Sequence, residues 1–202
     1  MTIAAEQDAK TFFAQNGYAV VRAFLAPALT DFFWQYVRMR AAFGLLTHRG
    51  KLVPTAPAAY GDAAFETLLE TARPTVEAVA GCRLLPTYSI VRVYSRGEML
   101  HRHRDRPACE ISVTVNVGQI PDAPWPIHIA GAKGDGTATL SPGDAMIYRG
   151  VALKHWREAY PGAQLGQVFL HYVDRDGPYA AHKFDGRPSL MRPKTGGGED
   201  DI

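Results

Sequence analysis

The sequence predicts a single α+β domain in which helices come first and a jelly roll, or double-stranded β-helix, of short strands follows. Apolar residues recur at helical spacing up to about residue 80, and from Arg83 onward they form short runs separated by Gly, Pro and Asp. Helices followed by many short strands are typical of an α+β domain whose helices support one face of the sheets. With 202 residues, 47% of them hydrophobic, the chain can bury one core, whereas two half-length domains would be marginal.

The expected domain covers residues 1–193, with a helical opening at 8–80, a jelly-roll core at 82–176 and a C-terminal extension at 177–193. Residues 194–202 are expected to form a disordered tail. In the opening we expect a helix at 11–15, a strand at 18–24, a helix at 27–43 and a helix at 62–80 that continues through Pro74. The aromatic stripe of the second helix, which includes Phe32 and Phe33, is expected to be core. Strands are expected at 87–94, 111–117, 125–130, 137–140, 145–148 and 167–173.

The composition favours neither nucleic acid nor membrane as a partner. Lys and Arg number 22 against 20 Asp and Glu, and the basic residues are scattered rather than gathered on one face. No apolar stretch approaches the length of a membrane span, and residues 1–10 lack the apolar run of a signal peptide, so we expect a cytoplasmic protein. Cys82 and Cys109 are expected to be reduced. The sequence does not indicate the oligomeric state.

Three residues are candidate metal ligands. His103 and Asp105 are separated by one residue near an expected strand end, so both side chains can leave the chain on the same face. Fe(II) sites with open coordination positions use two imidazoles and one carboxylate. The second imidazole is expected from His155, which starts a strand after the turn at Ser141–Asp144.

An HxD pair alone is weak evidence, since such triplets also arise by chance in solvated charge clusters. Arg102, Arg104 and Arg106 interleave the pair and would equally suit a basic surface turn. His101 shares the parity of His103 and is a rival ligand, which we assign to the approach to the metal rather than to its coordination.

Several ordered elements together resemble the prolyl-4-hydroxylase-like branch of the 2-oxoglutarate/Fe(II) oxygenases. The segment Tyr94–Leu100 is similar to that family's Tyr-x-x-Gly approach to the HxD pair, and Ser112–Asn116 resembles the strand that follows it. Pro142–Asp144 precedes the distal histidine, and the strand Gln167–Tyr172 completes the order. The opening at 16–43 also looks like that of the family, so the resemblance covers most of the chain.

The resemblance implies a 2-oxoglutarate-dependent non-haem iron dioxygenase. Its Fe(II) would be held by His103, Asp105 and His155, with 2-oxoglutarate as co-substrate and O₂ as oxidant. Decarboxylation of 2-oxoglutarate to succinate would accompany oxidation of a C–H bond. The carboxylate of Asp105 favours hydroxylation, because related halogenases replace it with a small residue. The substrate would be a small molecule, an amino acid or a peptide residue, and the sequence does not specify it further.

The chain departs from the family pattern at the anchor for the far carboxylate of 2-oxoglutarate. Leu165–Gln167 occupy the stretch after the distal histidine where the family usually has a basic residue. Arg157 shares a strand face with His155, and Arg92 alternates with Tyr94, so either can present a guanidinium fork to a carboxylate. The full set of expected 2-oxoglutarate contacts is Arg157, Arg92, Tyr94, Thr114 and Gln167.

The missing basic residue keeps two alternatives open. One is a cupin-like metal-binding protein without oxygenase activity. The other is an enzyme of the same fold that uses Fe(II) and O₂ without 2-oxoglutarate.

Overall fold

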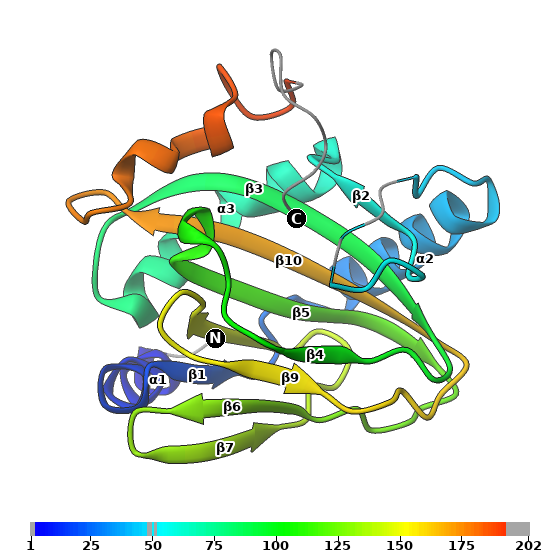
Figure 1. The fold of residues 1–202 in the computed structure, drawn as a ribbon, viewed down its shortest axis with the longest axis horizontal. Helices are drawn as coiled ribbons and strands as arrows, with labels where there is room; N and C mark the ends of the chain where they lie inside the picture. Colours follow the sequence, from blue (N-terminus) through cyan, green and yellow to red (C-terminus); the bar gives the residue numbers. More distant parts are fainter. Residues whose placement is uncertain (1–2, 48–49, 51, 193–202) are drawn as a thin grey trace.

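The computed structural model describes residues 3–47, 50 and 52–192 (Figure 1). The opening consists of α1 (Ile3–Asn16), β1 (Tyr18–Val21), α2 (Pro27–Ala42), β2 (Ala58–Tyr60) and α3 (Ala63–Ala80). The strands that follow are β3 (Leu84–Ser95), β4 (Leu100–His103), β5 (Ile111–Ile120), β6 (Ile127–Gly131), β7 (Gly134–Ala138), β8 (Ala145–Arg149), β9 (His155–Arg157) and β10 (Gln164–Asp174). Two short 3₁₀ segments are η1 (Pro107–Cys109) and η2 (Ala180–Gly186).

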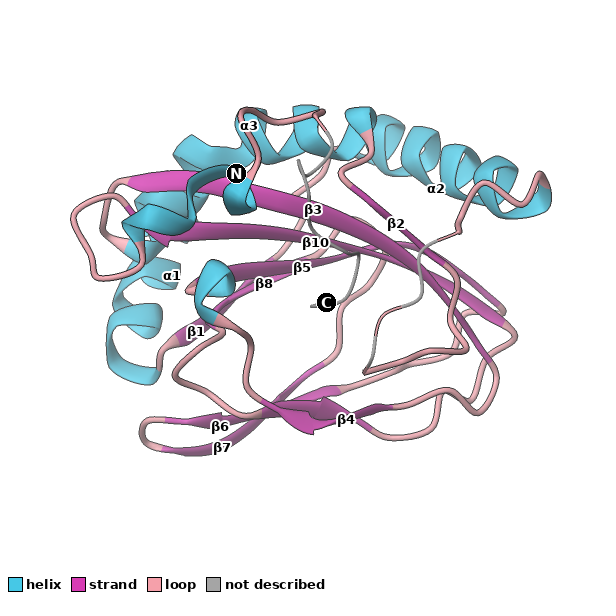
Figure 2. Ribbon diagram, turned by 45° about the horizontal axis from the view of Figure 1, so that its top comes forward, coloured by secondary structure: helices cyan, strands magenta, loops and turns pink. Residues whose placement is uncertain are grey.

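The strands form two antiparallel sheets. The larger sheet has the order β1-β8-β5-β10-β3-β2, and the smaller sheet has the order β4-β9-β6-β7. Figure 2 shows the smaller sheet opposite one face of the larger sheet, while α1, α2 and α3 lie on the other face. The expected combination of helices with antiparallel strands is therefore present.

Alternation along the strands gives the larger sheet an outer and an inner face. On β5, Val113 belongs to the apolar core beneath the helices, and its neighbours Ser112 and Thr114 face the opposite way, toward the smaller sheet. On β10, Leu170 lies in the same apolar core, whereas His171 lines a pocket between the sheets. Polar side chains on the inner face are thus brought together from strands that are distant in the sequence.

Helix α3 has well-defined ends and packs on the larger sheet. The side chain of Asp62 caps its start by accepting a hydrogen bond from the backbone N–H of Ala64 at 3.0 Å. The helix ends at Gly81, whose φ of 76° is a left-handed conformation that suits glycine. Pro74 lies inside the helix, which confirms that the helix continues through this proline.

The helix expected at 27–43 is confirmed as α2, but the expectation that its whole aromatic stripe is core is wrong. Phe33 and Val37 are buried, whereas Leu29 is 39% exposed and Phe32 is 58% exposed. The helix packs on the sheet through one face, and its apolar stripe is wider than that face. Periodicity therefore identified the helix but not the width of its covered surface.

Most expected strands appear within a few residues of their predicted bounds, although β7 begins and ends earlier than the strand expected at 137–140. The connection 44–61 contains β2, which pairs with β3 through Ala58 and Arg92. Both cysteines are free thiols, as expected. No helix in the described part of the chain is long and apolar enough to span a membrane. The tail expected at 194–202 lies outside the described residues.

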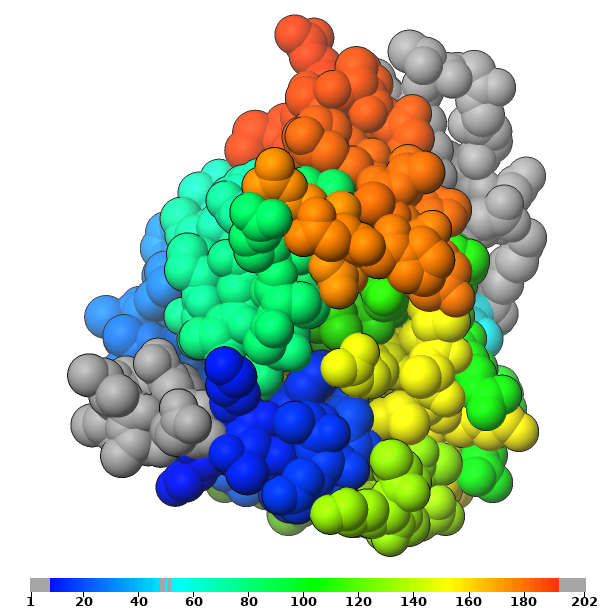
Figure 3. All heavy atoms as spheres, turned by 90° about the vertical axis from the view of Figure 1, so that its left-hand side faces the viewer, coloured from blue at the N-terminus to red at the C-terminus, as the bar shows by residue number. Residues whose placement is uncertain are grey.

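The C-terminal segment that contains η2 packs against β3, β10 and η1. In Figure 3 this segment, coloured orange to red, covers one end of the molecule beside the teal residues of α3. Two ion pairs attach it: Asp185 binds Arg106, and Arg187 binds Glu66. The segment is therefore fastened both to a helix and to the loop that follows β4.

Candidate metal centre

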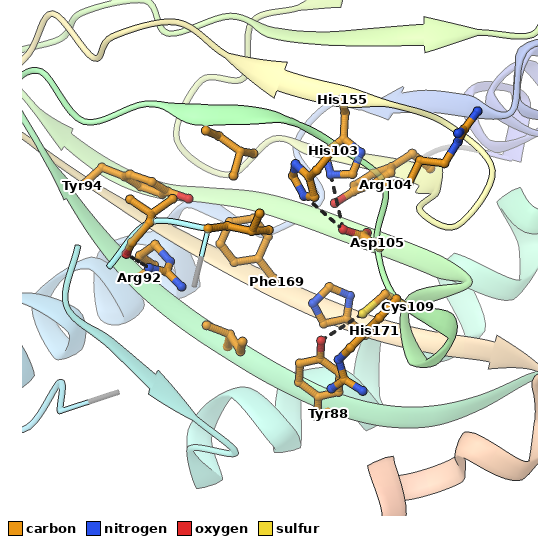
Figure 4. A pocket seen from close by; sticks show the side chains of 16 residues that line it. Tyr88, Arg92, Tyr94, His103, Arg104, Asp105, Cys109, His155, Phe169 and His171 are labelled. Atoms are coloured by element: carbon orange, nitrogen blue, oxygen red, sulfur yellow. Dashed lines mark hydrogen bonds and ion pairs between the residues drawn. The ribbon is translucent and has the colours of Figure 1, made fainter. Parts of the chain in front are cut away.

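The pairing of two short strands brings the candidate metal ligands together. Strand β4 runs antiparallel to β9, and His103 lies directly opposite His155 in their register. Asp105 follows β4 in a loop, where its backbone N–H donates to the carbonyl of Gly150 at 3.0 Å. The Nε2 atoms of His103 and His155 each lie 3.4 Å from Oδ1 of Asp105 (Figure 4). Three donor atoms thus converge from two strands and one loop.

The ring orientations of both histidines suit metal binding. Nδ1 of His103 lies 2.8 Å from the carbonyl of His101, and Nδ1 of His155 lies 3.1 Å from the carbonyl of Leu153. Each Nδ1 can therefore donate its proton to a backbone oxygen, which leaves the Nε2 lone pair for a metal ion. The donor atoms of the two histidines and Asp105 all lie within 4.8 Å of one another. Two imidazoles and one carboxylate in this arrangement fit Fe(II) with open positions.

His101 lies outside this cluster. Its side chain is exposed, and its carbonyl oxygen contacts Nδ1 of His103, the ring nitrogen that does not face Asp105. This placement agrees with the assignment of His101 to the approach rather than to coordination.

Asp105 is held by groups that the sequence alone did not reveal. Burial by itself would raise the pKa of this carboxyl, but the hydrogen bonds with His103 and His155 lower the pKa far below its usual range. The other carboxylate oxygen, Oδ2, accepts a hydrogen bond from the hydroxyl of Ser112 at 2.9 Å. Gly150 packs so closely that any added Cβ would clash with Oδ2 of Asp105. Neither Ser112 nor Gly150 belongs to a local pattern that marks it as part of a site.

A cavity of about 300 Å³ opens beside the candidate centre. The three metal-ligand candidates line it, together with a set of aromatic side chains. Figure 4 shows Arg92 and Tyr94 at one end of the cavity and Tyr88, Cys109 and His171 at the other, next to the candidate ligands, with Phe169 in between. The aromatic lining consists of Tyr88, Tyr94, Tyr148, Phe169 and His171.

Arg92 and Tyr94, two of the expected 2-oxoglutarate contacts, line this cavity. The guanidinium of Arg92 is buried and donates to the carbonyls of Val53 at 2.6 Å and Ala56 at 3.1 Å. Burial raises the pKa of Tyr94, while the charges of Arg92 and Arg157 act in the opposite direction. The Tyr94 side chain therefore lies in the field of two guanidinium groups.

The other three expected contacts, Arg157, Thr114 and Gln167, are buried but are not among the residues that line the cavity. Arg157 stacks 4.6 Å over the ring of Trp125 and donates to the Trp125 carbonyl. Its Nη2 is buried, with no hydrogen-bond partner among the described residues, and burial lowers the pKa of the guanidinium to about 10. The amide of Gln167 donates to the hydroxyl of Thr114. This part of the interior therefore holds a guanidinium with an unused donor.

The opposite end of the cavity carries groups of a different kind. The hydroxyl of Tyr88 and the thiol of Cys109 lie 2.9 Å apart and form a hydrogen bond. Burial raises the pKa of both groups well above their usual ranges, so both stay protonated. Nδ1 of His171 lies 2.9 Å from the hydroxyl of Ser112, and burial lowers the pKa of His171 to about 4. Tyr88, Cys109 and His171 therefore give this end of the cavity polar but uncharged groups.

Solved structures identify the fold, although no family model and no curated protein matches the sequence. The alpha-ketoglutarate-dependent epimerase SnoN from nogalamycin biosynthesis matches with a TM-score of 0.75 at 14% identity, over 96% of this chain and 94% of that one. SnoN in complex with Fe³⁺, alpha-ketoglutarate and nogalamycin RO also matches with a TM-score of 0.75, at 13% identity over 100% and 96%. A Pseudomonas putida prolyl-4-hydroxylase matches with a TM-score of 0.66 at 16% identity, over 85% and 100%.

A prolyl hydroxylase from Trichoplax adhaerens, in complex with a peptide fragment, matches with a TM-score of 0.69 at 13% identity, over 85% of this chain and 91% of that one. These likenesses show that the chain has the fold of the 2-oxoglutarate/Fe(II) oxygenases. The resemblance drawn from the segments around the candidate ligands is thereby confirmed at the level of the fold.

Proposed function

We propose that this chain is an Fe(II)/2-oxoglutarate-dependent dioxygenase that hydroxylates a C–H bond of a small molecule, an amino acid or a peptide residue. The observation that carries the proposal is the convergence of Nε2 of His103, Nε2 of His155 and Oδ1 of Asp105 beside a cavity, within the fold of this enzyme class. The strand order supports a jelly roll, because consecutive strands from β3 to β10 alternate between the two sheets, except that β6 and β7 are neighbours in the smaller sheet.

His103, Asp105 and His155 would hold Fe(II). Bound Fe(II) would supply O₂ activation for the reaction 2-oxoglutarate + O₂ + R–H → succinate + CO₂ + R–OH. The carbonyls of His101 and Leu153 keep each imidazole in the tautomer that a metal needs. The hydroxyl of Ser112 keeps the carboxylate oriented through its second oxygen.

We propose that Arg157, ahead of Arg92, binds the far carboxylate of 2-oxoglutarate. Arg157 lies two residues beyond His155 on the same strand, a step of roughly 6.6 Å, and both side chains are buried. A buried guanidinium without a carboxylate partner is costly, and a bound carboxylate would remove that cost. Arg92 ranks second because two carbonyls already accept from it. Tyr94, Thr114 and Gln167 would complete the pocket.

The absence of a basic residue keeps a second candidate function open. Enzymes of this class usually have a basic residue that binds the far carboxylate of 2-oxoglutarate, and this chain has Leu165 in that stretch. The rivals are a cupin-like metal-binding protein and an Fe(II)/O₂ enzyme that does not use 2-oxoglutarate. Anaerobic addition of 2-oxoglutarate to the Fe(II)-loaded protein separates the three. A visible charge-transfer band from the chelated keto acid is expected under the main proposal, and its absence would favour the rivals.

The ligand assignment has its own test. We expect His103→Ala and His155→Ala to abolish stoichiometric Fe(II) binding, while His101→Ala, an exposed neighbour on the same strand, keeps most of it. Asp105→Gly is expected to end hydroxylation with the fold intact by circular dichroism. Iron retained with turnover in His103→Ala would contradict the assignment, and global unfolding of Asp105→Gly would give Asp105 a structural role instead.

A further inference from the structure

A series of hydrogen bonds connects the candidate metal centre to His171 in the cavity wall. The hydroxyl of Ser112 lies 2.9 Å from Oδ2 of Asp105 and 2.9 Å from Nδ1 of His171. These residues come from the loop after β4, from β5 and from β10, and the register of β5 and β10 places Ser112 opposite His171. This series of hydrogen bonds therefore depends on strand pairing and not on proximity in the sequence.

The direction of each of these hydrogen bonds follows from the number of protons that Asp105, Ser112 and His171 carry. The carboxylate of Asp105 and the carbonyl of Cys109, 3.2 Å from the Ser112 hydroxyl, can only accept, so the single proton of that hydroxyl is donated to them and not to His171. Ser112 must then accept from His171, which requires the proton of His171 on Nδ1. Burial keeps this imidazole neutral, so Nε2 carries a lone pair and no proton.

The side chain of His171, whose Nε2 carries the lone pair, lines the cavity. Figure 4 shows the imidazole between the candidate metal ligands and Tyr88. Among the described residues, Nδ1 has a hydrogen-bond partner and Nε2 has none. A ring nitrogen of His171 also lies within 4.8 Å of a carboxylate oxygen of Asp105. A ligand group bound by His171 would therefore lie close to the metal ligands.

The charges at this end of the cavity limit what can bind there. Arg106 stacks 4.5 Å over Tyr88 and is neutralised by a bidentate ion pair with Asp185, at 2.6 and 2.9 Å. The hydroxyl of Tyr88 and the thiol of Cys109 are both protonated and form a hydrogen bond with each other. Arg104 also lines the cavity, but it lies beside the candidate ligands and donates through Nε to the carbonyl of Ala152, so a ligand carboxylate at His171 would meet a lone pair rather than a guanidinium. The carboxylate nearest to His171 is that of Asp105, a candidate metal ligand, so a ligand ammonium would compete with the metal for it.

We propose that His171 is a specificity-determining residue whose Nε2 accepts a hydrogen bond from an uncharged donor of the substrate, a hydroxyl or an amide N–H. The substrate class is then a neutral compound with an apolar or aromatic body, which packs against Tyr88 and Phe169, and a donor group near the oxidised carbon. This inference rests on the proposed oxygenase function.

The tautomer is tested in the metal-free protein. Nitrogen NMR of the ¹⁵N-labelled protein is expected to show Nδ1 of His171 protonated and Nε2 bare, with the resonances assigned by comparison with His171→Asn. Protonation of Nε2 instead of Nδ1 would overturn the inference, because the nitrogen that faces the ligand would then be a donor.

Ligand preference is tested by calorimetry on the anaerobic Fe(II)·2-oxoglutarate complex with four probes: benzyl alcohol, benzyl methyl ether, benzoate and benzylamine. Benzyl alcohol is expected to bind at least about fivefold more tightly than the ether, the size of one neutral hydrogen bond. Both charged probes are expected to bind more weakly than the alcohol. Equal affinities for alcohol and ether, or tighter binding of either charged probe, would overturn the inference.

Variants separate recognition from metal positioning. His171→Asn keeps a donor near Ser112 but has no atom at the place of Nε2, so we expect Fe(II) affinity to be retained and the preference for alcohol over ether to disappear. His171→Gln can place its amide oxygen near that position and is expected to restore part of the preference. His128→Asn, a change at a half-exposed histidine stacked on Trp156 away from the cavity, is the matched control.

The failures of the two proposals are distinguishable. A wild-type protein without the 2-oxoglutarate charge-transfer band contradicts the proposed function and this inference with it. A protein that shows the band, and whose preference for the alcohol survives in His171→Asn, contradicts the inference alone.

Discussion

The buried and half-buried arginines of this protein lie in two regions that differ in whether a carboxylate neutralises the guanidinium. Where the C-terminal segment meets the rest of the domain, Arg187 pairs with Glu66 at 2.6 Å and Arg106 pairs with Asp185 at 2.6 Å. Both carboxylates are almost fully buried. The positive charge of each guanidinium is neutralised by the fold itself.

Between the two sheets, Arg92 and Arg157 are equally buried, but neither forms an ion pair with a carboxylate in the described part of the chain. Only backbone carbonyls accept from them. Removing a guanidinium from water without a counter-charge is unfavourable, so this arrangement costs stability in the protein without ligand. Arginines paired with a carboxylate therefore stabilise the fold, whereas buried arginines without a carboxylate partner are suited to bind an anion.

The largest expected effect tests the paired region. Glu66→Gln leaves Arg187 buried without a counter-charge, and we expect the free energy of unfolding to fall by about 3–5 kcal/mol. Urea denaturation monitored by circular dichroism measures the change. The double variant Glu66→Gln/Arg187→Met removes the orphaned charge and should recover part of the loss. If the free energy of unfolding of the single variant falls by less than about 1 kcal/mol, the buried pair contributes no more to stability than a surface ion pair.

Asp185→Asn tests the second pair, which is partly open to solvent because the Arg106 side chain is 24% exposed. We expect a smaller loss of about 2 kcal/mol, since the hydrogen bonds that Asp185 accepts from Arg106 and Tyr60 are weakened at a site that is not fully buried. Thermal unfolding measures the loss, and 2-oxoglutarate titration of the same variant should give nearly unchanged affinity. A large drop in 2-oxoglutarate affinity would show that the two regions are not separate in function.

Arg157→Gln should behave in the opposite way. Because its guanidinium is desolvated without a carboxylate, we expect no loss in the stability of the ligand-free protein, while 2-oxoglutarate binds about 10–100-fold more weakly. Arg92→Gln should have a smaller effect on affinity, and the double variant a larger one. Each variant is titrated with 2-oxoglutarate after its iron content is verified. Unchanged affinity in all three would mean that the anchor lies elsewhere or that 2-oxoglutarate is not the co-substrate.

The smallest effect is expected at a surface pair that serves as a reference. Arg83 and Asp176 lie 3.2 Å apart with side chains 67% and 68% exposed. Arg83→Ala should change the free energy of unfolding by less than about 1 kcal/mol, because water screens an exposed pair. A change as large as that for Glu66→Gln would show that burial does not decide how much an arginine–carboxylate pair contributes to stability.

Local patterns in the sequence predicted a large part of the fold and pointed to the site. The spacing of His103 and Asp105 placed two candidate ligands on one face, and alternation placed Tyr94 and Arg92 together along one strand. The order of helices and strands correctly predicted a domain that combines helices with β-sheets. These features could be predicted because backbone geometry repeats over a few residues and leaves its period in the sequence.

Only the tertiary structure decided how distant segments meet. Ser112 and His171 are 59 residues apart and become neighbours through the register of β5 and β10, and Arg106 and Asp185 are 79 residues apart. The exposure of Phe32 likewise depends on which face of α2 the sheet covers. Strand register and layer packing come from burying apolar surface across the whole domain, a global balance that no short stretch of sequence records.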